Sequence, residues 1–230
     1  MDKKIKGSVM WLSLEDYLKK INSDSEKYYE FNENILKVTT EILPLNFKEI
    51  FNNENKILKF EIGFGNGDSL IKLALQNPEI NYFGIDRKMD RIRTALSKLN
   101  NKEKISNLQI ARFGTDYLLS MIPENSFHEI IMNFPDPWPK KKHHKNRTVN
   151  DEFIAVIHKL LKNDGIFRFS SDHVDYSFQV IDLFNRTELF KNIYHPAHYR
   201  TEVNNRIETQ FEKHKKREGF TIHHMKYLKV

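Results

Sequence analysis

Short apolar runs alternate, along the middle of the chain, with segments whose apolar residues recur every three or four positions. The runs predict strands, at residues 57–62, 81–86, 108–112, 129–133 and 166–170. The periodic segments predict helices, at residues 68–76, 88–99, 116–121, 150–161 and 176–185. Strands that alternate with helices favour an α/β fold, in which a mostly parallel sheet carries helices on both faces.

The two ends of the chain are less regular than its middle. Two more strands are predicted, around residues 194–199 and 220–229, and they bring the sheet to seven strands. Residues 1–56 are rich in Lys, Asn and Glu and contain one predicted helix, which has Ser13 as its N-cap. We expect a single domain over residues 1–230, with a core at 57–228 and an N-terminal extension that covers a sheet edge or meets RNA.

Composition narrows the class of protein. Hydrophobic residues make up 39% of the chain, enough to bury a core, and 37 Lys and Arg against 31 Asp and Glu give a net charge of +6. The absence of cysteine excludes disulfides, thiolate catalysis and cysteine-ligated zinc, and favours a cytoplasmic location. No apolar run approaches the roughly 20 residues that span a bilayer, so a soluble protein without a membrane partner is expected.

A glycine-rich turn follows the first strand of the core. Gly63, Gly65 and Gly67 lie between that strand and the first core helix, where residues without a Cβ let the backbone approach a ligand closely. Glu61 precedes the first glycine and could hold the ammonium of a methionine moiety. The turn therefore predicts a nucleotide-cofactor site rather than a turn that serves only helix packing.

The second core strand ends in an acidic residue. Asp86 can accept both ribose hydroxyls of an adenosine, but NAD carries the same ribose, so Asp86 alone does not discriminate. The G-x-G-x-G spacing, Glu61 and Asp86 together favour S-adenosylmethionine over NAD. Phe113, after the third strand, is expected near the adenine, where it either stacks on the base or leaves the amino group to Asp116.

The fourth core strand continues into the proline-framed stretch Phe134-Pro135-Asp136-Pro137-Trp138-Pro139. Each proline lacks an N–H and disfavours helix in the residue before it, so the chain should leave the sheet extended and stiff. Asp136 and Trp138 would then stand at the carboxyl end of a strand, where open α/β sheets bind ligands. Because the basic run Lys140–Arg147 follows, the expected ligand is a nucleic acid.

The available residues also limit which atom could accept a methyl group. The chain has no cysteine nucleophile, and the proline-framed stretch offers a carboxylate rather than a histidine base. Guanine N7 carries an unprotonated lone pair at neutral pH, so it needs no base before it attacks. Placing it in line with the methyl group can supply on the order of 7 to 11 kcal/mol of the activation barrier. Asp136 can accept hydrogen bonds from the Watson–Crick edge of guanine and favour its developing positive charge.

The neighbours of Asp136 extend the predicted acceptor site. Trp138 either stacks on a base or packs within its loop, and Lys140–Arg147 is expected to be mobile without RNA and to bind phosphates. Asp172 ends the fifth core strand at the same rim. His143 and His144 are adjacent, point in different directions and lack clustered carboxylates, so no metal site is predicted.

Several motifs together, in this order, resemble the bacterial tRNA (guanine-N7-)-methyltransferases, which modify a guanosine in the tRNA variable loop. The motifs are Glu61-x-Gly63-x-Gly65-x-Gly67, Phe134–Trp138 with Lys140 and the following His-Lys-Asn-Arg, Ser171-Asp172, and Thr209-x-Phe211-Glu212 with Gly219. The resemblance covers about residues 57–228. It implies a Rossmann-like class I S-adenosylmethionine-dependent methyltransferase fold, S-adenosyl-L-methionine as cofactor, tRNA as partner, and N7-methylguanosine at tRNA position 46 as product.

The resemblance also implies roles for individual residues. The cofactor contacts would be Glu61, Gly63, Gly65, Gly67, Asp86, Phe113 and Asp136, and Asp136 would also be the catalytic residue. The contacts to the substrate guanosine would be Lys140, Asp172, Thr209 and Glu212. Two positions depart from the family: Asp86 stands where Glu is frequent, and Phe113 where an acidic residue is common, so the adenine contact stays open.

Two other functions remain compatible with the sequence. Residues 133–138 distantly resemble the Pro-Pro motif of methyltransferases that act on exocyclic amines of nucleic acids. A non-catalytic RNA-binding module on a degenerate methyltransferase fold is the second alternative. The product separates the first alternative from guanine N7 methylation, since N7-methylguanosine is positively charged and base-labile. A monomer and a homodimer are both compatible with the sequence.

Overall fold

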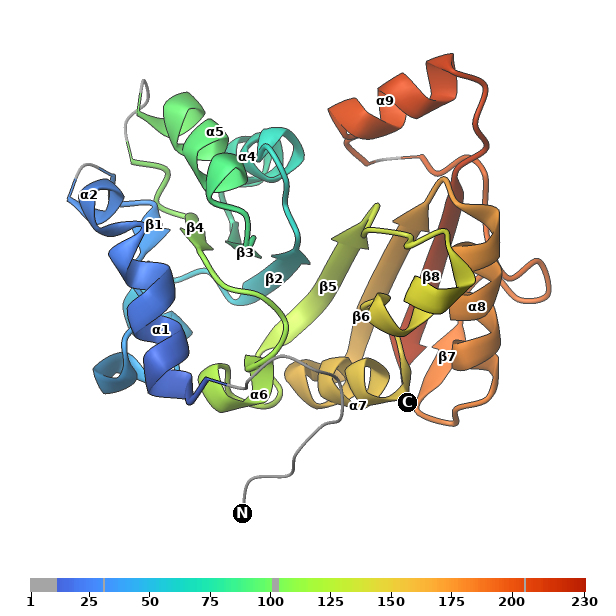
Figure 1. The fold of residues 1–230 in the computed structure, drawn as a ribbon, viewed down its shortest axis with the longest axis horizontal. Helices are drawn as coiled ribbons and strands as arrows, with labels where there is room; N and C mark the ends of the chain where they lie inside the picture. The colour runs from blue at the N-terminus through green and yellow to red at the C-terminus, as the bar shows by residue number, and fades with distance from the viewer. Residues whose placement is uncertain (1–11, 31, 101–103, 205) are drawn as a thin grey trace.

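A computed structural model describes residues 12–30, 32–100, 104–204 and 206–230. These residues form one sheet in the order β1-β4-β3-β2-β5-β6-β8-β7 (Figure 1). Strands β1 to β6 run parallel to one another, whereas β8 is antiparallel to both β6 and β7. The strands are β1 (Ile35–Leu36), β2 (Ile57–Ile62), β3 (Ile80–Ile85), β4 (Leu108–Ala111), β5 (Phe127–Asn133), β6 (Leu161–Ser171), β7 (Phe190–Asn192) and β8 (His223–Lys229).

Helices cover both faces of this sheet, so the predicted α/β architecture is confirmed. One apolar cluster joins the buried sides of α4 and α5 to one face, and a second joins α7 and α8 to the other. The helices are α1 (Leu14–Ser23), α2 (Glu26–Tyr29), α3 (Phe47–Phe51), α4 (Asp68–Gln76), α5 (Met89–Leu99), α6 (Leu118–Met121), α7 (Asp151–Leu160), α8 (Val174–Asn185) and α9 (Gln210–Arg217). Among the described residues, no helix combines the length and the apolar character needed to cross a bilayer.

The sheet has an eighth strand that the apolar pattern did not predict. Ile35 and Leu36 of β1 pair in parallel with β4, so the N-terminal extension covers the sheet edge. The Asn34 side chain holds this strand in position by donating to the carbonyls of Ile105 and Leu108, at 2.8 and 2.7 Å. A strand of two residues shows no alternation, because period two cannot be recognised in so short a run.

The strand predicted at residues 194–199 is wrong in position. The observed β7 ends at Asn192, whose side chain accepts from the Tyr194 N–H (2.8 Å) and donates to the His198 carbonyl (2.9 Å). These side-chain bonds curl the backbone out of the sheet, as Asn side chains do in turns. The chain returns to the sheet only at Arg200, which forms an isolated bridge with His224.

Arg147 fixes the proline-framed stretch to α8. Its side chain is 1% exposed, and its Nε donates to the Pro137 carbonyl at 2.8 Å. The remaining guanidinium nitrogens donate to Asp175 Oδ2 (2.6 Å) and to Gln179 Oε1, while the group lies 4.8 Å from the centre of the Tyr176 ring. Arg147 therefore belongs to the buried framework, and its inclusion in the exposed phosphate-binding run was wrong.

Substitution of Arg147 should destabilise the protein more than any change in the exposed part of the run. Lysine keeps the charge but cannot reproduce the planar fork of donors, so Arg147→Lys should lower the free energy of unfolding by about 2 to 3 kcal/mol. Urea unfolding followed by circular dichroism measures this loss. The control is Lys145→Met, at an exposed neighbour, which should change stability by less than about 0.5 kcal/mol. Equal effects of the two substitutions would contradict the role of Arg147.

Candidate functional site

The glycine turn between β2 and α4 borders open space. Gly63, Gly65 and Gly67 have φ values of 76, 60 and 76°, in the left-handed region that side chains disfavour. A Cβ added at Gly63 or Gly65 would meet no atom within 4 Å, whereas one at Gly67 would lie 3.0 Å from the Ala95 Cβ of α5. The first two glycines thus leave room for a ligand, and the third allows α4 to begin close to α5.

Glu61 lies at the end of β2, directly beside this turn. Its side chain is buried (3% exposed), and its Oε1 accepts from the Asn133 amide at 3.1 Å. Its Oε2 is buried without a hydrogen-bond partner among the described residues. Burial raises the pKa of Glu61 to about 7, against the lowering effect of Asn133 and with a further contribution from the charge of Asp86. An unpartnered buried carboxylate oxygen is unfavourable, and a ligand ammonium group would fit it.

Asp86 joins the glycine turn to the end of β3. Its Oδ2 accepts from the Gly65 N–H at 3.1 Å and its Oδ1 from the Lys88 N–H at 2.8 Å. Burial raises its pKa, although both backbone hydrogen bonds oppose that effect. The structure therefore brings Asp86 and the glycine turn together, as the sequence predicted for a ribose site.

Of the two alternatives that the sequence left open, stacking of Phe113 on an adenine is the less favoured. Its ring is fully buried and packs in the core against Phe83, with the ring centroids 6.2 Å apart, so it has no free face. Of the two alternatives, only Asp116 has an exposed side chain. The turn between them is held by the N-terminal extension, since the Gly114 N–H donates to the Tyr17 hydroxyl at 2.7 Å.

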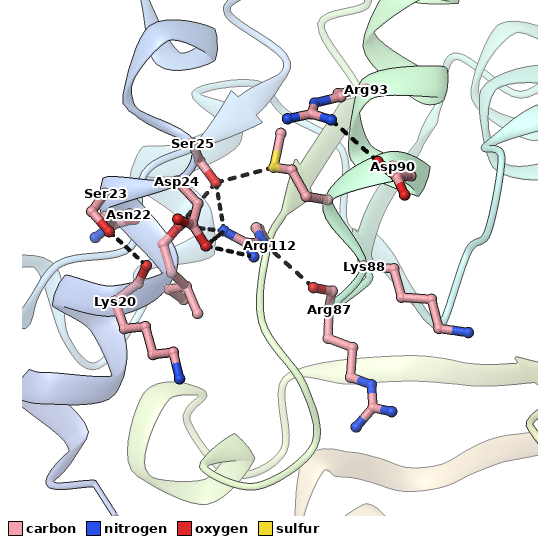
Figure 2. Close-up of polar contacts among 12 residues, drawn as sticks. Lys20, Asn22, Ser23, Asp24, Ser25, Arg87, Lys88, Asp90, Arg93 and Arg112 are labelled. Atoms are coloured by element: carbon pink, nitrogen blue, oxygen red, sulfur yellow. Dashed lines mark hydrogen bonds and ion pairs between the residues drawn. The ribbon is translucent and has the colours of Figure 1, made fainter.

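A second contact with the N-terminal extension holds the ends of β3 and β4 (Figure 2). The Arg112 guanidinium donates to the Ile21 carbonyl (2.7 Å) and the Ser25 hydroxyl (3.1 Å), and it pairs with Asp24 at 3.3 Å. Its Nε reaches the carbonyl of Arg87, the residue after Asp86, at 3.4 Å. The extension thus braces the ends of β3 and β4, next to Asp86, the acidic partner of the glycine turn.

Asp136 stands exposed just past the carboxyl end of β5, on the same side of the sheet as Glu61 and Asp86. Its side chain is 60% exposed, and its Oδ2 lies 3.8 Å from Lys88 Nζ at the start of α5. Phe134 and Trp138, on either side, have φ values of 51 and 44°. Positive φ is uncommon for aromatic residues, and such strain occurs most often where surrounding structure holds a functional site. The carboxylate is therefore accessible to a substrate on a backbone held in an unusual conformation.

The basic run after Asp136 contains a short helix. Residues Lys141–Asn146 form a 3-10 helix, η2, and the lysines of the run, including Lys140, are exposed. His143 stacks on Trp138 with the ring centroids 5.9 Å apart and an interplanar angle of 13°. One face of the Trp138 ring is consequently covered, and the packing alternative for this residue is favoured.

The remaining predicted substrate contacts lie on β6 and α9. Asp172 is partly buried just past β6, and Thr209 is the N-cap of α9, where its hydroxyl accepts from the Glu212 N–H at 3.0 Å. Glu212 is fully buried and ion-paired with Arg206 and with His224, the latter at 3.4 Å. Burial raises the pKa of Glu212, but hydrogen bonds and charges from His224 and Arg206 outweigh it and lower the pKa to about 2. Its Oε1 is thus engaged within the protein, whereas its Oε2 is buried without a hydrogen-bond partner among the described residues.

Three residues of the site were not predicted. Asn133 orients Glu61, Lys88 pairs with Asp136, and Arg206 neutralises Glu212. Asn133 carries a detectable signal, because it is a polar residue at the carboxyl end of an apolar strand. The other two are ordinary basic residues in basic segments, and no sequence feature distinguishes them from solvated charges.

Comparison with known proteins agrees with this geometry. A protein family described as "Putative methyltransferase" matches residues 55–225. The tRNA (guanine-N(7)-)-methyltransferase of Francisella philomiragia is 39% identical over 170 residues, which cover 74% of this chain and 72% of that protein. The enzyme of the same name from Vibrio vulnificus is 35% identical over 188 residues, with 81% and 78% covered.

A solved structure supports the fold independently. The aminoglycoside resistance methyltransferase NpmB1 superimposes with a TM-score of 0.56 at 14% sequence identity, covering 79% of this chain and 91% of that chain. At that identity the likeness concerns the fold alone, which is the class I methyltransferase fold that the sequence predicted. The extent of sequence identity with the curated relatives goes further: the chain belongs to the tRNA (guanine-N7-)-methyltransferase family.

Proposed function

We propose that this protein transfers a methyl group from S-adenosyl-L-methionine to N7 of a guanine at position 46, in the variable loop of tRNA, and forms N7-methylguanosine. The observation that carries the proposal is the set of acidic side chains at the carboxyl ends of β2, β3 and β5. Glu61 offers a buried, unpartnered oxygen, Asp86 contacts the glycine turn, and Asp136 is exposed at the end of β5. The names of the relatives supply the nucleic acid and the accepting atom.

The residues around the glycine turn fit S-adenosylmethionine group by group. Glu61 would bind the ammonium of the methionine moiety through its free Oε2, and Asp86 would accept from the ribose hydroxyls. Gly63 and Gly65 leave the space that the ligand needs, and Asp116 is available for the adenine amino group. When bound, the cofactor supplies an electrophilic methyl group on a sulfonium.

Asp136 would position the guanine. Its carboxylate accepts hydrogen bonds from the N1–H and the exocyclic amine, and the base replaces Lys88, 3.8 Å away, as its partner. Guanine N7 needs no proton removed before it attacks, so the residue acts by orientation and by favouring the positive charge that develops on the base. Lys140 and Asp172 would contact the same nucleoside from the neighbouring loop and strand end.

Thr209 and Glu212 would act from α9, at the far side of the acceptor site. Glu212 is ion-paired inside the protein, so we propose that it shapes the site through Arg206 and His224. We further propose that residues 57–228 are the catalytic core of one domain. Residues 1–56 would serve it as a brace, in a protein that works on tRNA in the cytoplasm.

One experiment tests this function and separates it from the alternatives. The protein is incubated with labelled S-adenosylmethionine and unmodified tRNA, and the digested RNA is examined for methylated nucleosides. We expect a positively charged, base-labile N7-methylguanosine. An N-methylated amine would indicate the exocyclic-amine reaction, and absence of incorporation into folded tRNA would contradict any methyltransferase function on this substrate.

Asp136 should affect turnover more than RNA affinity. Asp136→Asn keeps the shape of the side chain but loses the charge, so kcat should fall on the order of 10²- to 10³-fold, by analogy with loss of one charge-stabilising group. The Kd for tRNA should change less than about threefold, because phosphate contacts dominate RNA affinity. Steady-state kinetics and a binding titration give both numbers. Near-normal kcat would remove Asp136 from its assigned role.

The exposed lysines of the basic run should govern the salt dependence of tRNA binding. Each phosphate contact adds about one unit to the slope of log K against log salt concentration. Reversal of charge at Lys141, Lys142 and Lys145 should therefore weaken binding and flatten that slope by about two to three units. Binding titrations at several salt concentrations measure it, with charge reversal at Lys19 of α1 as the control. An unchanged slope would mean that the run does not contact RNA.

Glu61 should make cofactor affinity sensitive to pH. Its pKa, raised to about 7 by burial, means that it is largely protonated, and unable to pair with an ammonium, at about pH 5.5. The Kd for S-adenosylmethionine should fall on the order of tenfold between about pH 5.5 and about pH 7 as the carboxylate ionises. Isothermal titration calorimetry measures this change. Glu61→Gln should bind weakly with little pH dependence, and methylthioadenosine, which lacks the ammonium, should show a similar pH dependence in both proteins. An equal pH dependence of the Kd in Glu61→Gln and in the wild type would refute the contact between Glu61 and the ammonium group.

A further inference from the structure

Two exposed aromatic rings lie at the α9 side of the site without a role in the proposed function. Phe211 is 46% exposed and Phe220 is 48% exposed. Lys215 Nζ lies over both rings, 5.7 Å from the Phe211 centroid and 4.5 Å from the Phe220 centroid. An ammonium over a ring face is a favourable contact, so the lysine links the two rings into one cluster.

The end of α9 explains why Phe220 lies beside Lys215. Gly219 has a φ of 84°, its N–H donates to the Lys216 carbonyl, and the Phe220 N–H donates to the Lys215 carbonyl, each at 3.0 Å. This pattern is a Schellman motif, in which the residue after the glycine folds back over the last turn and usually makes an apolar contact there. Here the partner is a lysine, so much of the Phe220 ring stays open to solvent.

Phe211 connects the cluster to the proline-framed stretch. Its ring packs on Phe134, with the centroids 5.0 Å apart and the planes at 54°. Phe134 lies two residues before Asp136 and has the left-handed backbone that turns the chain at this edge. Figure 1 shows α9 standing beyond the ends of β5 and β6, where Asp136 and Asp172 follow their strands. The exposed rings therefore continue outward from the acceptor site.

We propose that Phe211 and Phe220, with Lys215 between them, form a stacking surface for an unpaired nucleobase of the RNA, next to the guanine that Asp136 binds. The inference rests on the proposed function and extends it to a second nucleotide. A guanine that is drawn out of its stack leaves its neighbour without a partner, and aromatic rings accept any base because every base has a π-face.

The charge of α9 favours RNA over a protein partner for this surface. Lys215, Lys216 and Arg217 all lie in the last turn of the helix. Lys215 pairs with Glu218 and Lys216 with Glu208, at 2.8 and 2.7 Å, whereas Arg217 has no ion pair within the described part of the chain. A polyanion is attracted to such a surface, and single-stranded nucleic acids are commonly bound by aromatic rings set among basic side chains. The combination of two half-exposed rings with these cations matches that chemistry.

The test compares Phe220→Leu with a matched control. Leucine keeps an apolar side chain but has no ring face, so Phe220→Leu should raise the Kd and the KM for unmodified tRNA by about 5- to 100-fold. Phe220→Tyr, which keeps the ring, should stay within about twofold of the wild type. Phe178→Leu removes a similarly exposed ring (53%) from α8 and should also stay within about twofold. The salt slope should not change in Phe220→Leu, because no cation is lost.

Abasic substrates identify the stacked base. At one position beside the target guanine, loss of the base should weaken binding to the wild type but should add little to the effect of Phe220→Leu. Additive effects at every position, or wild-type affinity in Phe220→Leu, would overturn the inference. A change in the oligomeric mass of Phe220→Leu without a change in its tRNA binding would also overturn the inference. If the wild type binds and methylates no tRNA, it is the proposed function that fails, and the two outcomes are thereby distinguished.

Discussion

The site depends on a buried carboxylate with one oxygen left unpartnered. Because β2 lies between β3 and β5, Glu61 at its end is flanked by Asp86 on one side and Asn133 on the other. Among the residues that the structure describes, only Asn133 donates to it, so the fold holds a partly satisfied carboxylate at the carboxyl ends of its central strands. Such a group persists because strong packing of the surrounding strands determines its position. A cationic ligand would complete it.

Two buried carboxylates, Glu61 on β2 and Glu212 on α9, have pKa values that shift in opposite directions. Burial dominates at Glu61 and raises its pKa to about 7, whereas Arg206 and His224 overcome burial at Glu212 and lower its pKa to about 2. Near neutral pH Glu61 can therefore gain or lose a proton, while Glu212 remains ionised. Different neighbours around the same chemical group produce this separation, as is common where two carboxylates serve different tasks.

Local motifs determined what could be predicted from the sequence. The strands and helices between residues 57 and 185, the glycine turn and Asp86 follow from patterns within about 30 residues. The structure has these strands and helices close to their predicted positions, whereas the strand predicted at 194–199 is not found there. The acceptor half needed the family resemblance, because Thr209 and Glu212 are distant in sequence from Asp136. Burial could not be read from composition: Arg147 sits in a basic run yet is enclosed, and Phe113 follows a strand yet points into the core. Both outcomes depend on tertiary contacts with residues far along the chain.

The short strand β1 has a consequence for the solubility of the folded protein. Without it, β4 would be the outer strand of a sheet whose inner strands are long and parallel, and its unpaired N–H and C=O groups would form a template for another chain. Ile35 and Leu36 of β1, held by the Asn34 side chain, pair with β4 and form the outer strand instead. A strand of two residues offers little length for pairing with another chain. The N-terminal extension therefore also protects the sheet from edge-to-edge aggregation.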